Sequence, residues 1–292
     1  MAERKRRRMS EARTGGSGAG RARHLRSGLS ILPSLFTVGN IFCAYYSVMS
    51  TLNARWDQAA VAIGVGYILD GLDGRVARLT GTSTEFGAQL DSLADVLTFG
   101  IAPAILAFAW GIGVGVTPPG VNPIVQHIRS AGWLMTFAFV ICGALRLARF
   151  NVQAQKPVDS SSKRYFVGLP IPAGAGLLAS IVHFWQEPIV TPGGSLLWCL
   201  LIGITAFLMI STVRYHNFKE LGIVSRRPRV ALVLAAMTIA LIFSYSEYML
   251  LLLAVVYVSS GPVAKLVQVV RKLPLPATPP RESASMEPRR EP

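Results

Sequence analysis

The chain has 292 residues, of which 51% are hydrophobic and only 15% are charged, and its mean hydropathy is +0.44. An average soluble domain carries about 25% charged residues, so this composition excludes a disordered chain and disfavours an ordinary soluble enzyme. The charge is also unbalanced, with 29 Lys and Arg against 15 Asp and Glu. In a soluble protein such an excess would indicate nucleic-acid binding, whereas in a membrane protein it reflects the charge of the loops.

Long apolar stretches follow one another along most of the chain. A helix that crosses a bilayer needs about 20 mostly apolar residues. Eight such stretches are present, at residues 31–51, 58–79, 86–115, 131–151, 170–186, 194–213, 229–246 and 248–270. The fifth is rich in Gly and Pro, and the last two meet at Ser246 and Glu247, so seven spans is the alternative count. We therefore predict an all-α integral membrane protein, a polytopic bundle of about eight transmembrane helices.

The basic residues fall on one side of this predicted topology. With an even number of spans the two termini share a side, and residues 1–30 alone carry nine Lys and Arg. Of all 29, only Arg55 and Arg129 fall in the opposite set of connections, which is the positive-inside pattern of membrane proteins. Both termini are therefore expected to be cytoplasmic. The excess requires no nucleic-acid partner, and attraction to membrane lipid is compatible with it.

The two ends of the chain differ from its apolar middle. Residues 1–30 are basic and Gly-rich, residues 271–292 are rich in Pro, Glu and Arg, and both are expected to be disordered cytoplasmic tails. The first apolar run begins later than the apolar run of a cleavable signal peptide does. Residues 31–270 make up the predicted membrane domain.

Four aspartates lie within 26 residues of largely apolar or small sequence: Asp70, Asp73, Asp91 and Asp95. An aspartate at membrane depth is costly unless it is compensated, so a functional role is the default expectation. The structural alternatives are helix capping and salt bridges to Arg75 and Arg78.

The spacing of the four aspartates favours one shared site. Asp70 and Asp73 are three residues apart near the cytoplasmic end of the second span, and Asp91 and Asp95 are four apart near the start of the third, so each pair occupies one helix face. A short connection makes the two helices an antiparallel hairpin, on which the carboxylates can converge. Two divalent cations would balance four negative charges, and an all-oxygen ligand set without His or Cys selects Mg²⁺ or Mn²⁺. Such a site suits phosphoryl transfer.

Small and basic residues accompany these aspartates. Gly74 and Ala77 follow Asp70 on its helix face, and Gly87 lies one turn before the third aspartate, which leaves room for a ligand against the backbone. Arg78 adds a guanidinium for phosphate oxygens.

The segment from Asp70 to Asp95 reads DGLDGRVAR, eight residues, G, three residues, D, three residues, D. It resembles in full the signature of the CDP-alcohol phosphatidyltransferases. Within that family the chain is similar to the bacterial branch that uses CDP-diacylglycerol and serine, on motifs at residues 32–40, 145–151, 165–172 and 211–219. Ser34 is a departure, because the family often has Asn there.

This resemblance implies a reaction and a set of roles. A primary hydroxyl, that of L-serine, would attack the diacylglycerol-linked phosphate of CDP-diacylglycerol, and CMP would leave. One metal ion would be held by Asp70, Asp73 and Asp91, the other by Asp70, Asp91 and Asp95. Asp95 would also be the general base on the serine hydroxyl, a role that suits a carboxylate at the edge of a metal cluster. The CDP-diacylglycerol contacts would come from Gly74, Ala77, Arg78, Thr84 and Gly87, with Ser34 and Thr37 reaching from the first span.

The same resemblance implies a homodimer in a bacterial-type inner membrane, with the active site on the cytoplasmic side.

Serine brings a carboxylate, which requires a cation. Arg146 and Arg149 lie three residues apart at the end of the fourth span, with Asn151 beside them, and we expect these three to bind serine. The alternative interpretation of both arginines is that they anchor the helix end at the membrane surface.

Other functions remain open at this point. Glycerol 3-phosphate, inositol phosphate or choline would keep the chemistry and change the acceptor alcohol. An intramembrane prenyltransferase or a cation transporter is more remote, because the aspartates gather on one predicted hairpin instead of along several spans.

The remaining candidate ligands are scattered. Neither the histidines of the membrane domain nor the cysteines have partners at metal-ligand spacing, and no site is assigned to His127, His183, His216, Cys43, Cys142 or Cys199.

Overall fold

The computed structural model describes residues 31–80, 84–113, 123–154, 166–215 and 228–272. These residues form the helices α3 (Ile31–Leu52), α4 (Trp56–Thr80), α5 (Glu85–Asp95), α6 (Ala102–Phe108), α7 (Pro123–Ala154), α8 (Ile171–Trp185), α9 (Pro192–Ile210), α11 (Pro228–Ser244) and α12 (Ser246–Lys272). Two π-helical turns, η1 (Val96–Ile101) and η2 (Ala109–Gly113), precede and follow α6. The predicted tail at residues 1–30 and nearly all of that at residues 271–292 lie outside the described residues.

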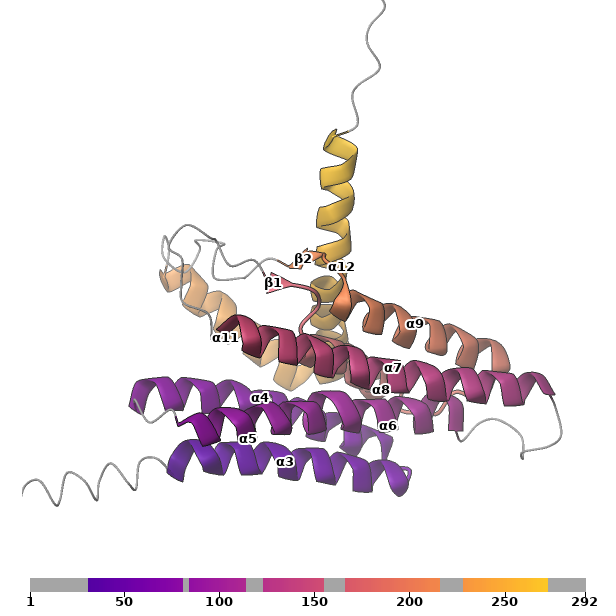
Figure 1. Cartoon of the computed structure of the whole chain (residues 1–292), viewed down its shortest axis with the longest axis horizontal. Helices are drawn as coiled ribbons and strands as arrows, with labels where there is room; N and C mark the ends of the chain where they lie inside the picture. Colours follow the sequence, from indigo (N-terminus) through magenta and orange to yellow (C-terminus); the bar gives the residue numbers. More distant parts are fainter. Residues whose placement is uncertain (1–30, 81–83, 114–122, 155–165, 216–227, 273–292) are drawn as a thin grey trace, which may run out of the picture.

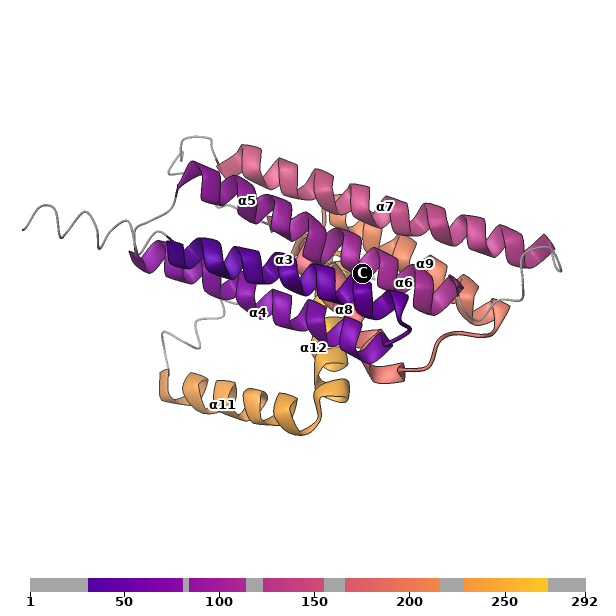
Figure 2. The ribbon, with the colours of Figure 1, turned by 90° about the horizontal axis from the view of Figure 1, so that it is seen from below.

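The helices form a layered bundle with one member set across it. α3 packs along α4, α7 packs along α9, and α8 contacts both α4 and α12. Figures 1 and 2 both show α3, α4, the α5–α6 segment and α7 running lengthwise beside one another. In Figure 1, α12 runs across their direction, so it meets the bundle at a steep angle.

Within the part of the chain that the structure describes, five helical segments are long and apolar enough to cross a membrane: Leu35–Leu52, Glu85–Gly113, Pro123–Gln153, Pro192–Ile210 and Ser246–Val267. The predicted helical membrane class is thus confirmed. α4 has the length but carries five charged residues, and the apolar helices Ile171–Trp185 and Leu232–Ser244 are shorter. The count of eight spans and the cytoplasmic placement of both termini stay predictions.

The structure differs from the sequence prediction in three details. The third predicted span is interrupted by η1 and η2, and Pro103, the second residue after η1, has no N–H with which to continue the α-helical hydrogen bonds. α7 begins at Pro123, eight residues earlier than predicted. A short antiparallel ladder, β1 (Phe166–Val167) with β2 (Arg214–Tyr215), was not anticipated.

A tight contact between α4 and η1 sets the position of the candidate site. A Cβ at Gly66 of α4 would lie 2.6 Å from Thr98 Cγ2 and 2.9 Å from Asn40 Oδ1. Thr98 in turn donates its hydroxyl to the Asn40 carbonyl of α3, at 3.1 Å. A glycine therefore lets three backbone segments meet one helical turn away from Asp70.

Candidate active site

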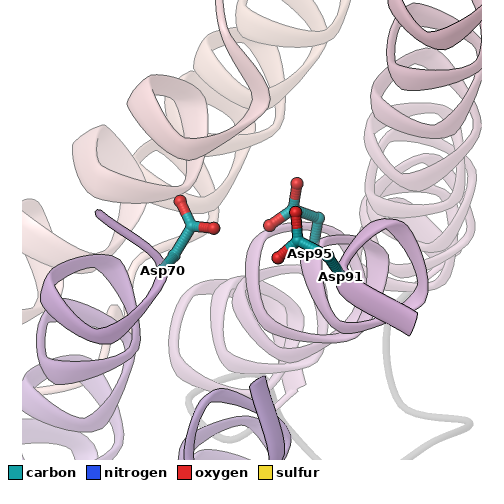
Figure 3. Close-up of side chains that lie close together, drawn as sticks. All are labelled: Asp70, Asp91 and Asp95. Atoms are coloured by element: carbon teal, nitrogen blue, oxygen red, sulfur yellow. The ribbon is translucent and has the colours of Figure 1, made fainter. Parts of the chain in front are cut away.

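Three carboxylates converge between α4 and α5. Asp70 lies on α4, Asp91 and Asp95 lie on α5, and each offers an oxygen within 4.8 Å of the others. Figure 3 shows Asp70 facing the other two across the space between the helices. All three are partly buried. The structure therefore brings together three of the four predicted metal ligands, from both arms of the predicted hairpin.

The fourth aspartate, Asp73, is outside this group of three. It is 6% exposed, and its Oδ2 accepts the hydroxyl of Thr37, which is 3% exposed on α3. Side chains three residues apart on a helix differ in direction by about 60° around its axis, so Asp73 and Asp70 point in different directions. Thr37, predicted to contact the nucleotide, thus binds a predicted metal ligand.

The surroundings of Asp95 fit a divalent cation. Its Oδ1 is buried and has no hydrogen-bond partner among the described residues. A buried carboxylate oxygen without a partner is unfavourable, and a cation bound by the all-oxygen set of Asp70, Asp91 and Asp95 would compensate it. Directly after Asp95 the helix widens into the π turn η1, with the Ala102 N–H bonded to the Leu97 carbonyl. Such turns are frequent at functional sites.

The residues predicted to hold the CDP part have more open surroundings. A Cβ at Gly74 would find only Arg78 Nη2, at 4.0 Å, and the Arg78 side chain is exposed. Thr84 caps the N-terminus of α5, because its Oγ1 accepts the Gly87 N–H at 3.0 Å. Two further candidates, Ser34 and Ala77, lie on α3 and α4, but their side chains are not among those described.

The residues predicted to bind serine lie at the end of α7, which runs beside α5. Asn151 Nδ2 donates to Ser92 Oγ at 2.9 Å, which ties α7 to the helix that carries Asp91 and Asp95. Arg146 is partly buried, and its buried Nε has no hydrogen-bond partner within the part of the chain that the structure describes. Arg149 is exposed. The structure thus brings Asn151 to the aspartate hairpin and leaves Arg146 with a free donor.

A second polar cluster lies at the start of α4, at the end of this helix that is farther from Asp70. His183, 8% exposed on α8, places Nδ1 2.5 Å from Asp57 Oδ1 on α4 and Nε2 3.0 Å from Ser246 Oγ on α12. Nothing in the sequence near His183 indicates this contact, because 126 residues separate His183 from Asp57. One available signal was the predicted topology, which places Asp57 and the end of the fifth span on the same side of the membrane.

A comparison with protein families matches the region that contains the three aspartates. The model of the family described as CDP-alcohol phosphatidyltransferase matches residues 30–213. The chain belongs to this family. It is therefore an enzyme, a CDP-alcohol phosphatidyltransferase, and within the matched region Asp70, Asp91 and Asp95 form an acidic cluster that could bind metal.

Curated relatives of this phosphatidyltransferase carry the name CDP-diacylglycerol–serine O-phosphatidyltransferase. The relative from Helicobacter pylori (strain ATCC 700392 / 26695) is 36% identical over 196 residues, which cover 66% of this chain and 74% of the relative. The relative from Bacillus subtilis (strain 168) is 32% identical over 192 residues, or 66% of this chain and 93% of the relative. The relative from Saccharomyces cerevisiae is 40% identical over 164 residues, which cover 53% of this chain and 54% of the relative. The family match ends before α11 and α12.

Proposed function

We propose that this phosphatidyltransferase transfers the phosphatidyl group of CDP-diacylglycerol to L-serine, producing phosphatidylserine and CMP. The observation that carries the proposal is the convergence of Asp70, Asp91 and Asp95 between α4 and α5 in a chain of this family. The names of the curated relatives support serine as the acceptor.

Two divalent cations, Mg²⁺ or Mn²⁺, would occupy the acidic cluster. We assign Asp70, Asp73 and Asp91 to one and Asp70, Asp91 and Asp95 to the other. Bound there, the cations would neutralise phosphate oxygens and stabilise the departing CMP. The oxygen-only donor set fits such ions. Thr37 would orient the Asp73 carboxylate through the hydroxyl that it donates.

The transfer itself requires one proton acceptor from the chain. The serine hydroxyl oxygen forms a bond to the phosphorus of the phosphatidyl group, the bond from that phosphorus to CMP breaks, and the hydroxyl proton goes to a base. We assign this role to Asp95, whose buried Oδ1 is free of hydrogen bonds to the described residues. Asp95 is also the last of the three aspartates along α5 and directly precedes η1. Removal of the proton increases the nucleophilicity of the hydroxyl in the transition state.

The substrates are held by the residues around this cluster. The CDP part would lie along Gly74, Ala77, Arg78, Thr84 and Gly87, with Ser34 and Thr37 reaching it from α3. The open space at Gly74 supports close approach of the nucleotide to the α4 backbone. Arg146, Arg149 and Asn151 would bind serine, and the free Nε of Arg146 supports this part of the proposal.

The cellular arrangement follows from the charge distribution and the family. We propose that residues 31–270 form the membrane domain, flanked by two cytoplasmic tails, and that the enzyme is a homodimer in a bacterial-type inner membrane. The Asp70 cluster would then face the cytoplasm, where CMP is released. The positive-inside distribution of Lys and Arg supports this orientation.

An acceptor panel tests the proposed function. The purified enzyme is given CDP-diacylglycerol and Mn²⁺ or Mg²⁺, and CMP release is measured with L-serine, glycerol 3-phosphate, inositol phosphate or choline as the added alcohol. We expect release with L-serine alone, together with formation of phosphatidylserine. Activity only with a phosphorylated acceptor would contradict the serine assignment and leave the family chemistry intact.

A further inference from the structure

Two consecutive hydrogen bonds join the end of α7 to the helix that carries Asp91 and Asp95. Asn151 Nδ2 lies 2.9 Å from Ser92 Oγ, and Ser92 Oγ lies 3.0 Å from the Ala88 carbonyl oxygen. Figure 2 shows α5 and α7 side by side. Ser92 directly follows Asp91 and precedes Asp95 by three residues, or about 4.5 Å along the helix. Asn151 therefore meets α5 about one helical turn from the proposed general base.

These two bonds determine which end of the Asn151 amide faces α5. A serine hydroxyl has a single proton, and that of Ser92 is donated to the Ala88 carbonyl. Ser92 Oγ then only accepts a hydrogen bond from Asn151, so the amide NH₂ group faces Ser92. If the amide were turned by 180°, two acceptor oxygens would compete for the one Ser92 proton, and one of the two bonds would be lost. The Asn151 Oδ1 atom therefore faces away from Ser92.

The Oδ1 atom of Asn151 is available to a ligand. It has no hydrogen-bond partner within the part of the chain that the structure describes, and the residue is partly buried. An amide oxygen accepts hydrogen bonds and cannot donate one, so it suits an N–H group and does not suit a carboxylate or a phosphate. The bond to Ser92 holds the amide in this orientation before a ligand arrives, which lowers the cost of ordering it on binding.

We propose that Asn151 Oδ1 accepts a hydrogen bond from the ammonium group of the amino-alcohol acceptor, and that Ser92 is the positioning residue that orients this amide. In L-serine only two carbon atoms separate the ammonium nitrogen from the hydroxyl oxygen, so one molecule reaches both Asn151 and Asp95. Glycerol 3-phosphate, inositol phosphate and choline have no ammonium N–H, so the amide favours serine over all three. The serine carboxylate is left to the arginines of the proposed function. This inference rests on the proposed use of serine.

The test separates the contribution of the ammonium group from that of the rest of the acceptor. 3-Hydroxypropanoate keeps the hydroxyl and the carboxylate of serine and lacks the ammonium group. With the purified full-length enzyme, Mn²⁺ and saturating CDP-diacylglycerol, CMP release gives the KM for L-serine and the inhibition constant of 3-hydroxypropanoate against L-serine. Melting temperatures are recorded for the same preparations.

The substitutions remove or keep single hydrogen-bonding groups. Asn151→Leu has a similar shape without polar atoms, Ser92→Ala removes the hydroxyl, and Ser92→Thr keeps it. Ser195→Ala is the matched control, because the Ser195 hydroxyl of α9 also joins two helical segments, through a 2.7 Å bond to the Gly111 carbonyl of η2.

We expect Asn151→Leu to raise the KM for L-serine by roughly 10- to 150-fold, the range for one hydrogen bond to a charged group. Ser92→Ala should raise it by roughly 2- to 12-fold, the range for a hydrogen bond between neutral groups, and Ser92→Thr should restore it. The inhibition constant of 3-hydroxypropanoate should stay within about twofold of its original value in every variant, as should both constants for Ser195→Ala.

An unchanged KM for L-serine in Asn151→Leu would overturn the inference, and so would an equal weakening of L-serine and 3-hydroxypropanoate. If the melting temperature shows that Asn151→Leu is unfolded, the same two constants of Ser92→Ala decide, with Ser92→Thr as the rescue. If the unaltered enzyme does not use serine at all, the proposed function itself fails.

Discussion

Replacing Asp95 with Asn tests both parts of the proposed role of this carboxylate. The substitution keeps the shape of the side chain and removes one negative charge and the proton acceptor. Asp95 has two carboxylate neighbours, Asp70 and Asp91, with oxygens within 4.8 Å. At an effective dielectric constant of about 20, two unit charges at that separation repel by about 3.5 kcal/mol. Without metal, and with all three carboxylates ionised, the two pairs would together oppose folding by about 7 kcal/mol.

Asp95→Asn should therefore change stability in opposite directions without and with metal. The metal-free variant should be at least as stable as the unaltered enzyme, because both repulsions are removed. Its stabilisation by added Mn²⁺ should be smaller, because one charged ligand is lost. Loss of a general base should lower kcat by about 10²- to 10⁴-fold.

The assay combines thermal unfolding with turnover. Melting temperatures are recorded in chelator and over a range of Mn²⁺ concentrations, and CMP release from CDP-diacylglycerol is measured at saturating L-serine. Glu187→Gln is the control, because it removes an exposed carboxylate from the connection between α8 and α9. The reasoning is refuted if Asp95→Asn keeps kcat within tenfold of the unaltered enzyme, or if it lowers the metal-free melting temperature while the response to Mn²⁺ is unchanged.

Two further substitutions examine the residues around the cluster. Gly74→Ala and Gly71→Ala both place a methyl group where the structure is open, so each should leave stability equal or up to about 1 kcal/mol higher, as unfolding measurements will show. Only Gly74→Ala should raise the KM for CDP-diacylglycerol, and an equal effect of both would exclude a nucleotide contact at Gly74. Thr37→Val deprives Asp73 of a buried donor and should cost about 1–3 kcal/mol of stability and raise the Mn²⁺ concentration for half-maximal activity. Thr205→Val is its control and should leave the Mn²⁺ dependence unchanged, because the Thr205 hydroxyl donates to the Leu201 carbonyl of its own helix.

The features that sequence predicted well are those that depend on short-range periodicity. Runs of apolar residues predicted the main helices, and the spacing of Asp91 and Asp95, four residues apart, correctly placed both on one face. The spacing of Asp70 and Asp73 was less decisive. A three-residue step leaves about 60° between the two side chains, enough for one to face α5 and the other to reach Thr37 on α3. The packing of α3, which sequence periodicity does not determine, selected between these directions.

The contacts that sequence did not predict join residues far apart in the chain. Asn151 meets Ser92 across 59 residues, and His183 meets Asp57 across 126 and Ser246 across 63. Each depends on how two helices slide and rotate against each other, which is determined by the whole core. The π turn after Asp95 is similar, because Pro103 removes one hydrogen bond but the neighbouring helices determine how the backbone adapts.

The predicted metal ligands are local in sequence, but their geometry depends on four helices. Thr37 attaches Asp73 to α3, Gly66 lets α4 approach η1, and Asn151 attaches α7 to Ser92, the residue after Asp91. A motif of 26 residues therefore identifies the chemistry, whereas the separation of the carboxylates is maintained by residues from 37 to 151. Since the proposed two-metal site would require its ligands at fixed separations, we expect catalysis to depend on the packing of α3 and α7 as well as on the aspartates themselves.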